Sequence, residues 1–217
     1  DARQCDSLIL VSSDYPITTD RTEALVSLDE KNLIAGEAVQ PLAELIRASE
    51  AACGEKILFT SVYRTLAFQE SIYGVNPFAA KPGESEHHSG LSADIKVEGY
   101  AQRRFIMSKT GKWMAKNAHR FGFIIRYPLW AEKRTGVDYE PWHLRYVGNP
   151  HAEIIYRMKI TLEEYLALIE TGAFYRYGNT VISRQTGEKI DFPKTVRDIC
   201  VSRDSRGGYI AWGTDTV

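Results

Sequence analysis

The most informative stretch of the chain is SEHHSGLSAD, residues 85–94. It places two histidines in a polar turn, then Gly90, where the backbone can bend, and then Asp94 in an alternating polar and apolar run. Residues seven apart on one straight strand face opposite sides and lie more than roughly 20 Å apart. A bend at Gly90 can instead bring His87 and Asp94 together, so we expect a turn that leads into a strand over residues 91–97.

A second segment, YEPWH at residues 139–143, carries a carboxylate and an imidazole close together. The two segments can offer a histidine, Asp94 and His143 to one metal ion and leave Glu140 free beside it. Such a donor set is typical of a catalytic zinc site with an open position, where a separate Glu takes a proton from water. Either segment alone fits a hydrogen-bonded structural histidine better, and it is their joint presence that favours a metal.

Helical patterns occur on both sides of these segments. Apolar spacing and capping residues predict helices over residues 35–53, 65–73, 110–120 and 161–171. Gly54 lies where a left-handed cap would end the first helix, and Thr65 can cap the second. Thr161 and Glu164 form a capping box at the start of the last helix.

Strand patterns complete the expected fold. Runs of β-forming residues predict strands over residues 56–63, 91–97, 123–127 and 143–147, the last after a break at Pro141. Turn signals follow at Asn76-Pro77 and Lys81-Pro82-Gly83. Gly178-Asn179 and Thr186-Gly187 suggest hairpins within residues 175–192, and residues 208–212 an edge strand. Helices grouped around strands favour an α+β fold with a central, mostly antiparallel sheet flanked by helices.

Composition excludes several classes of protein. The 217 residues have 44% hydrophobic and 25% charged content, an ordinary globular balance. Lys and Arg number 27 against 28 Asp and Glu, so the net charge is −1 and the chain lacks the excess of positive charge typical of nucleic-acid-binding proteins. The apolar runs are far shorter than the roughly 20 residues of a membrane span. We therefore expect neither a nucleic-acid partner nor a membrane span.

The three cysteines have no CxxC spacing, which argues against a structural zinc knuckle. Cys5 and Cys200 lie near the two ends, and the sequence leaves open whether they form a bridge. The chain does not begin with Met, so the sequence also leaves open whether a signal or anchor preceded it.

With these segments identified, the chain resembles the VanY-type D-alanyl-D-alanine carboxypeptidases, a zinc-peptidase group that includes lysostaphin-like enzymes and the hedgehog signalling domain. The motifs that carry the resemblance are SVYR (61–64), FQ (68–69), PGESEH (82–87), Gly90, Asp94, GFIIRYP (122–128) and EPWHLRYVG (140–148). The similarity covers residues 8–168. It implies a zinc peptidase domain over residues 1–171 with a hedgehog/D-Ala-D-Ala-peptidase-like fold. Residues 172–217 lie outside the resemblance, and we expect them to form a β-rich extension packed on this domain.

The resemblance also implies roles for individual residues. The zinc ligands fall on His87, Asp94 and His143, the catalytic base on Glu140, an oxyanion-stabilising cation on Arg64, substrate-binding donors on Gln69 and Ser85, and pocket walls on Tyr127 and Trp142. The family spacing selects His87 over its neighbour His88, which we expect to point to solvent or to lie behind the ligands. His119 and His151 have no partner motif and are expected to be structural.

The implied function is zinc-dependent removal of the C-terminal D-Ala from peptidoglycan stem peptides, with no organic cofactor. The implied location is extracytoplasmic, in the cell wall or at a membrane anchor outside this sequence, and the family is associated with antibiotic resistance. An L,D-carboxypeptidase and a bifunctional D,D-dipeptidase/carboxypeptidase are alternatives with the same chemistry. A zinc-containing module that binds cell wall or protein without catalysis is an alternative of another class. The role of residues 172–217 and the oligomeric state stay open.

Overall fold

The computed structural model describes residues 2–76 and 79–217, and it divides the chain into two compact units. The larger unit is Val11–Thr161, and the smaller unit joins the residues up to Leu10 with Leu162–Val217. The N-terminal segment belongs to the smaller unit because β1 (Arg3–Cys5) pairs in parallel with β10 (Val196–Arg203). In the second half of the chain, the border between the two units lies between Thr161 and Leu162.

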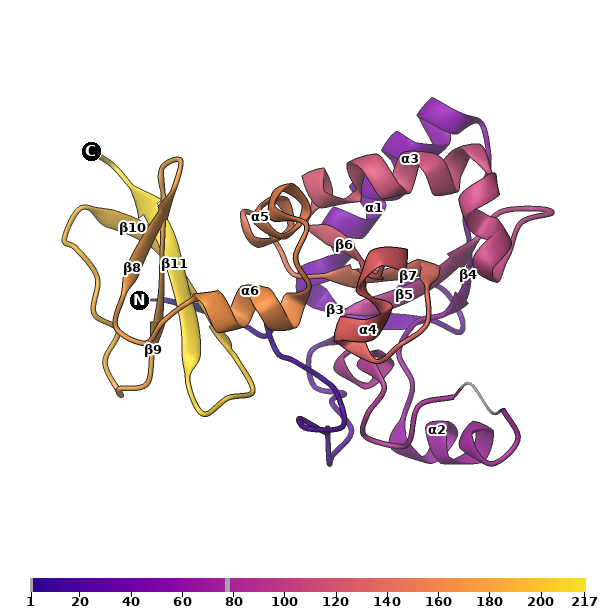
Figure 1. The fold of residues 1–217 in the computed structure, drawn as a ribbon, viewed down its shortest axis with the longest axis horizontal. Helices are drawn as coiled ribbons and strands as arrows, with labels where there is room; N and C mark the ends of the chain where they lie inside the picture. Colours follow the sequence, from indigo (N-terminus) through magenta and orange to yellow (C-terminus); the bar gives the residue numbers. More distant parts are fainter. Residues whose placement is uncertain (1, 77–78) are drawn as a thin grey trace. The chain divides into compact units, whose positions relative to one another are not determined.

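The larger unit is built on a four-stranded sheet in the order β4-β5-β7-β6. These strands are β4 (Leu58–Ser61), β5 (Ser92–Lys96), β7 (Glu140–Tyr146) and β6 (Phe123–Tyr127), and all neighbours are antiparallel. Figure 1 shows the strands between the helices α1 and α3 on one side and α2 and α4 on the other. The expected α+β fold with an antiparallel sheet is confirmed.

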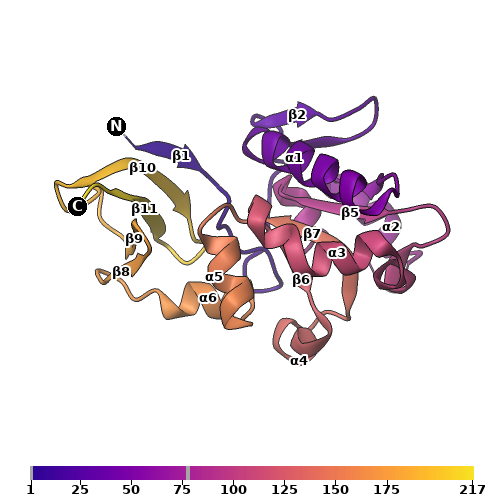
Figure 2. The same ribbon diagram turned by 90° about the horizontal axis from the view of Figure 1, so that it is seen from above.

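The hydrophobic core of this unit lies between the sheet and two helices, α1 (Gly36–Cys53) and α3 (Lys109–Asn117). Leu42 and Leu45 of α1 and Met114 of α3 pack with Ala93 and Leu144 of the central strands. Viewed from above in Figure 2, both helices run along the same side of the sheet. As predicted, α1 ends at a left-handed cap, because Gly54 has φ 68°. The core therefore occupies one face of the sheet and leaves the other face for different chemistry.

The remaining elements of the larger unit are short. They are β2 (Leu25–Ser27), β3 (Leu33–Ala35), α2 (Leu66–Tyr73), α4 (Glu132–Thr135), α5 (His151–Met158) and the 3₁₀ helices η1 (Glu86–Ser89), η2 (Gln102–Met107), η3 (Ala118–Phe121) and η4 (Leu129–Ala131). Thr65 caps α2 as predicted, because its hydroxyl accepts the amide N–H of Phe68. The β2–β3 hairpin and α5 were not predicted. The turn expected at Asn76-Pro77 lies partly outside the described residues. No helix in the described ranges has the length and apolar character needed to cross a membrane.

Two predicted boundaries in this unit were wrong. β7 begins at Glu140 and runs through Pro141, although a break was expected there. Proline is tolerated because the ladder with β5 ends at the pair Asp94–His143, so no β5 residue stands opposite Pro141. The helix expected over residues 110–120 ends at Asn117 and continues as η3 up to Gly122.

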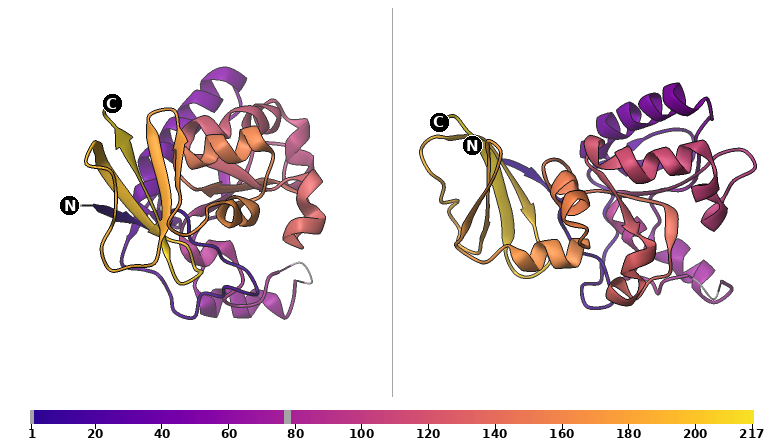
Figure 3. Two further views of the ribbon diagram at one scale, coloured as in Figure 1. Left: turned by 60° about the vertical axis from the view of Figure 1, so that its left-hand side comes forward. Right: turned by 45° about the horizontal axis from the view of Figure 1, so that its top comes forward.

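The smaller unit is a five-stranded sheet in the order β1-β10-β11-β9-β8, preceded by α6 (Leu162–Leu168). The hairpin at Gly178-Asn179 is confirmed, because it joins β8 (Phe174–Tyr177) to β9 (Thr180–Gln185). The second expected hairpin is wrong: β9 pairs with β11 (Tyr209–Asp215), which is an interior strand and not an edge. Figure 3 shows this sheet in orange and yellow, with the indigo β1 beside it.

Pairing of β1 with β10 also decides the cysteine arrangement. Cys5 stands opposite Ser202, and Cys200 stands opposite Arg3. Within the described residues no disulfide joins Cys5 and Cys200.

Candidate metal centre

The sheet aims two of the expected ligands at a common point. Asp94 of β5 stands opposite His143 of β7. Their chain neighbours Ala93 and Leu144 point into the hydrophobic core. Because side chains alternate along a strand, Asp94 and His143 project from the opposite face of the sheet.

The bend at Gly90 brings the third ligand to the same place. Gly90 has φ 72°, and a Cβ there would lie 2.6 Å from a methyl carbon of Leu25. Only glycine suits this conformation and this space. The turn lets η1 fold back, so that Nε2 of His87 lies 3.1 Å from Oδ2 of Asp94. The predicted turn is confirmed.

The three side chains form a compact, buried set of donors. Nδ1 of His143 lies 2.9 Å from Oδ1 of Asp94. One ligand atom from each of His87, Asp94 and His143 lies within 4.8 Å of the others. Two imidazoles and one carboxylate are the donors of a zinc site that keeps a position open. The set therefore fits zinc by its chemistry and by its convergence.

The outer nitrogen of each imidazole also fits a metal site. Nδ1 of His87 faces the backbone carbonyl of Val62, which leaves Nε2 directed at Asp94. His143 is turned the other way: Nδ1 is directed at Asp94, and Nε2 faces the Glu86 carboxylate at 3.5 Å. Ligating histidines commonly have their other nitrogen engaged in this manner.

The electrostatics of the centre favour positive charge. Burial by itself lowers the pKa of His143, but Asp94, Glu86 and Glu140 outweigh burial and raise this pKa to about 10. Burial opposes ionisation of Asp94, yet His87 and His143 hold the pKa of its carboxyl well below the usual range. A cation at this point would be stabilised by the same carboxylates.

Glu140 lies beside the donors at the start of β7, opposite Tyr127. Its Oε2 is 3.6 Å from Nδ1 of His143, and its side chain is 26% exposed, more than those of the three ligands. Burial, together with the negative charges of Asp94 and Glu86, raises the pKa of Glu140. A carboxylate with a raised pKa and access to solvent is suited to accept and return a proton.

Arg64 is held next to the same centre by three side chains. Its Nη2 lies 3.3 Å from Oδ2 of Asp94, its Nε donates to Ser61 at 2.7 Å, and its Nη1 donates to Oε1 of Gln69 at 3.3 Å. The amide nitrogen of Gln69 donates in turn to the carbonyl of Ala80. Gln69 is fully buried, and its amide links Arg64 to the backbone at Ala80.

The other three residues expected to bind substrate, Ser85, Tyr127 and Trp142, lie in different surroundings. Ser85 directly precedes η1 and is buried. The ring of Tyr127 lies 5.1 Å from the ring of His143. Trp142 packs against the hydrophobic core. The structure thus brings Tyr127 to the metal residues and directs Trp142 to the core side.

His88 does not point to solvent. It is fully buried, its Nδ1 donates to the carbonyl of Arg64 at 2.8 Å, and its Nε2 accepts the N–H of Gly83 at 3.1 Å. Both bonds need the neutral ring, and burial accordingly lowers its pKa. His88 lies behind the ligands, where it ties the Pro82–Gly83 turn to Arg64. His119 stacks on Tyr156 outside the centre, and His151 is buried in α5.

Sequence reasoning did not single out a buried cluster of charges behind His143. Glu86 receives hydrogen bonds from Arg126 of β6 and Arg145 of β7, and all three side chains are at most 1% exposed. Arg145 and His143 are two residues apart on β7, so they share a face of the sheet. The alternation of side chains along β7 was the sequence signal that could have placed Arg145 on the same face as His143.

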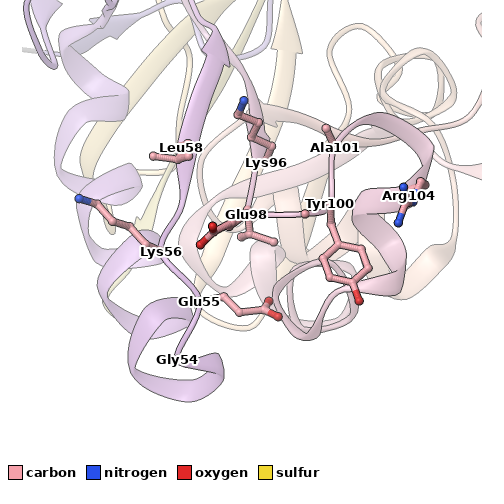
Figure 4. Close-up of a pocket in the computed structure, with 11 residues that line it drawn as sticks. Gly54, Glu55, Lys56, Leu58, Lys96, Glu98, Tyr100, Ala101 and Arg104 are labelled. Carbon is pink, nitrogen blue, oxygen red and sulfur yellow. The ribbon is translucent and has the colours of Figure 1, made fainter.

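A separate cavity of about 1090 Å³ opens at the other end of the sheet. Figure 4 shows its lining, which includes Glu55, Lys56, Lys96, Tyr100 and Arg104. None of the expected site residues lines it, so it is not the candidate metal centre.

A family model and several known proteins match this chain. Residues 31–149 match the VanY family, described as D-alanyl-D-alanine carboxypeptidase. A D-alanyl-D-alanine carboxypeptidase of Enterococcus faecium is 32% identical over an alignment of 177 residues, and the match covers 74% of this chain and 57% of that protein. The chain belongs to the VanY D-alanyl-D-alanine carboxypeptidase family. It spans little more than half the length of that curated relative.

Two solved structures resemble the chain. A mutant of the D,D-pentapeptidase VanY from a VanB-type resistance cassette, in complex with Zn(II), is 35% identical and covers 74% of this chain and 98% of its own, with a TM-score of 0.64. The D,D-dipeptidase VanXYg, in complex with a D-Ala-D-Ala phosphinate analogue, is 25% identical and covers 97% of this chain and 94% of its own, with a TM-score of 0.84. The second likeness extends over the smaller unit as well.

Proposed function

We propose that this chain is a zinc-dependent carboxypeptidase that removes the C-terminal D-Ala from peptidoglycan stem peptides ending in D-Ala-D-Ala. The observation that carries the proposal is the convergence of His87, Asp94 and His143, with Glu140 and Arg64 beside them. Membership of the VanY family and the likeness to a zinc complex support it. Because stem peptides lie outside the cytoplasm, an extracytoplasmic location follows from the same proposal.

His87, Asp94 and His143 would hold the zinc ion. When bound, zinc supplies Lewis acidity toward the scissile carbonyl and makes the attacking water easier to deprotonate. Nδ1 of His87 faces the Val62 carbonyl and Nε2 of His143 faces the Glu86 carboxylate, so the other nitrogen of each imidazole is directed toward the centre.

Glu140 is assigned as the proton carrier. Its carboxylate takes a proton from the water whose oxygen forms the new bond to the carbonyl carbon. When the C–N bond breaks, the same proton passes to the nitrogen of the departing D-Ala. The raised pKa of Glu140 suits both transfers, because it brings the acid and base forms closer in energy at neutral pH.

Arg64 is assigned to the developing negative charge on the carbonyl oxygen. Its guanidinium is permanently charged and is held by Asp94, Ser61 and Gln69, so its donors need little reorganisation during the reaction. We assign Ser85 and Gln69 to the terminal carboxylate of the substrate and Tyr127 to the pocket wall. Trp142 receives no role in the pocket because it packs on the core.

The test is release of D-Ala by the zinc-loaded protein from four substrates. These are the D-Ala-D-Ala dipeptide and stem peptides of three, four and five residues. We expect release from the pentapeptide. Cleavage of the dipeptide as well would indicate the bifunctional D,D-peptidase that the likeness to VanXYg favours. Release from the tetrapeptide alone would indicate an L,D-carboxypeptidase. If no substrate releases D-Ala, the alternative of a zinc-containing module that binds without catalysis would be favoured.

A further inference from the structure

The carboxylate of Glu86 is surrounded by charged and polar groups with no access to solvent. Its Oε1 accepts hydrogen bonds from Nε of Arg126 at 2.8 Å and from Nη1 of Arg145 at 2.7 Å. Its Oε2 accepts the hydroxyl of Ser92 at 3.3 Å and lies 3.5 Å from Nε2 of His143. The two oxygens are therefore divided between the arginines and the side of the metal centre.

A gain in protein stability does not by itself explain why these three charged side chains are buried together. Removing charges from water costs several kcal/mol per ion, and replacing a buried ion pair by packed apolar residues often leaves a protein equally stable or more stable. Glu86, Arg126 and Arg145 come from η1, β6 and β7, and all are at most 1% exposed. The function of the cluster is indicated by the second carboxylate oxygen of Glu86, Oε2, which faces the metal centre.

That oxygen faces one nitrogen of one ligand. Nε2 of His143 is buried and has no hydrogen bond at ordinary distance among the described residues, so the Glu86 carboxylate is the acceptor available to it. An N–H at Nε2 leaves the lone pair on Nδ1, the atom that lies 2.9 Å from Asp94. His87 is arranged in the opposite way, with Nδ1 on the Val62 carbonyl and Nε2 toward Asp94.

We propose that Glu86, anchored by Arg126 and Arg145, is a positioning residue that selects Nδ1 of His143 as the metal-ligating atom. The inference rests on the proposed zinc centre and adds a residue to it. Glu86 touches neither the substrate nor the metal and acts through the imidazole. Outer partners of this kind typically change metal affinity by 10- to 100-fold.

The first test measures zinc affinity of the Glu86→Gln variant by competition with a chromogenic chelator. The amide keeps the volume of the side chain but accepts the N–H less strongly, so we expect the zinc dissociation constant to rise about 10- to 100-fold. The matched control is Asp204→Asn, which removes a buried carboxylate from Arg184 in the smaller unit. The control should lose stability with its zinc affinity unchanged.

A second measurement needs no variant and so does not depend on the folding of Glu86→Gln. Histidine ¹⁵N NMR of the zinc-loaded wild-type protein should show His143 protonated at Nε2 and coordinated through Nδ1, with His87 reversed. Coordination of His143 through Nε2 would overturn the inference. So would unchanged zinc affinity in Glu86→Gln, or an equal loss of affinity in Asp204→Asn.

These measurements separate the inference from the proposed reaction. A protein that binds zinc through the stated nitrogens and loses zinc affinity in Glu86→Gln, but releases no D-Ala, would support the role of Glu86 and refute the carboxypeptidase. A wild-type protein that binds no zinc would overturn both.

Discussion

Each unit of the molecule buries a cluster of arginine and carboxylate side chains, and the two clusters have different roles. In the smaller unit, Asp204 binds Arg184 and accepts the backbone N–H groups of Arg206 and Gly208. In the larger unit, Glu86 binds two arginines and turns its other oxygen toward His143. One carboxylate holds a loop, and the other holds a side chain of the candidate site. Burial of an ion pair therefore does not identify a site, whereas the atoms that the pair faces can do so.

The largest effect should come from removing a ligand in the larger unit. His143→Ala leaves two donors, too few for an open tetrahedral site, so zinc should be lost and D-Ala release should fall by on the order of 10³-fold or more. Metal content by elemental analysis and a D-Ala assay check this expectation. The control is His88→Ala, which should keep zinc because the ring of His88 faces backbone groups. Stoichiometric zinc in His143→Ala would refute the ligand assignment.

Glu140→Gln should separate metal binding from turnover. The amide cannot accept the proton of water, while the three donors remain, so zinc content should persist and turnover should fall on the order of 10²- to 10⁴-fold. Elemental analysis and steady-state kinetics of the same preparation provide the measurement. Unchanged turnover would mean that another group carries the proton.

A smaller effect should follow from a change in the substrate. If Ser85 and Gln69 hold the terminal carboxylate, an amidated pentapeptide loses charge-assisted hydrogen bonds worth about 1.5–3 kcal/mol each. We expect its kcat/KM to be at least about tenfold lower than that of the free acid, since tenfold corresponds to about 1.4 kcal/mol. Equal rates on the two peptides would point to an endopeptidase, even if every zinc ligand is correct.

The smallest effect on activity should come from the other buried pair. Asp204→Asn removes one partner from Arg184, whose side chain is 10% exposed while that of Asp204 is fully buried. Breaking such a pair typically lowers the free energy of unfolding by about 3–5 kcal/mol. Denaturant unfolding should show this loss, and kcat/KM should stay within about twofold of the wild type. A large loss of activity in the folded variant would contradict the claim that only the Glu86 cluster serves the candidate site.

The sequence by itself was sufficient for the features that depend on local spacing. The bend at Gly90, the caps at Gly54 and Thr65 and the alternation that aims Asp94 away from the core all follow from residues close together in the chain. Resemblance to the VanY family added the choice of His87 over His88, and the structure brings His87 to Asp94.

Only the tertiary structure decided the features that depend on distant neighbours. The pairing of β1 with β10 and of β9 with β11 joins segments that no local pattern relates. The surroundings of Glu86 are set by arginines that lie 40 and 59 residues farther along the chain. The physical reason is that a side chain's partners are fixed by which strands lie beside it, and strand pairing is a contact between residues far apart in sequence.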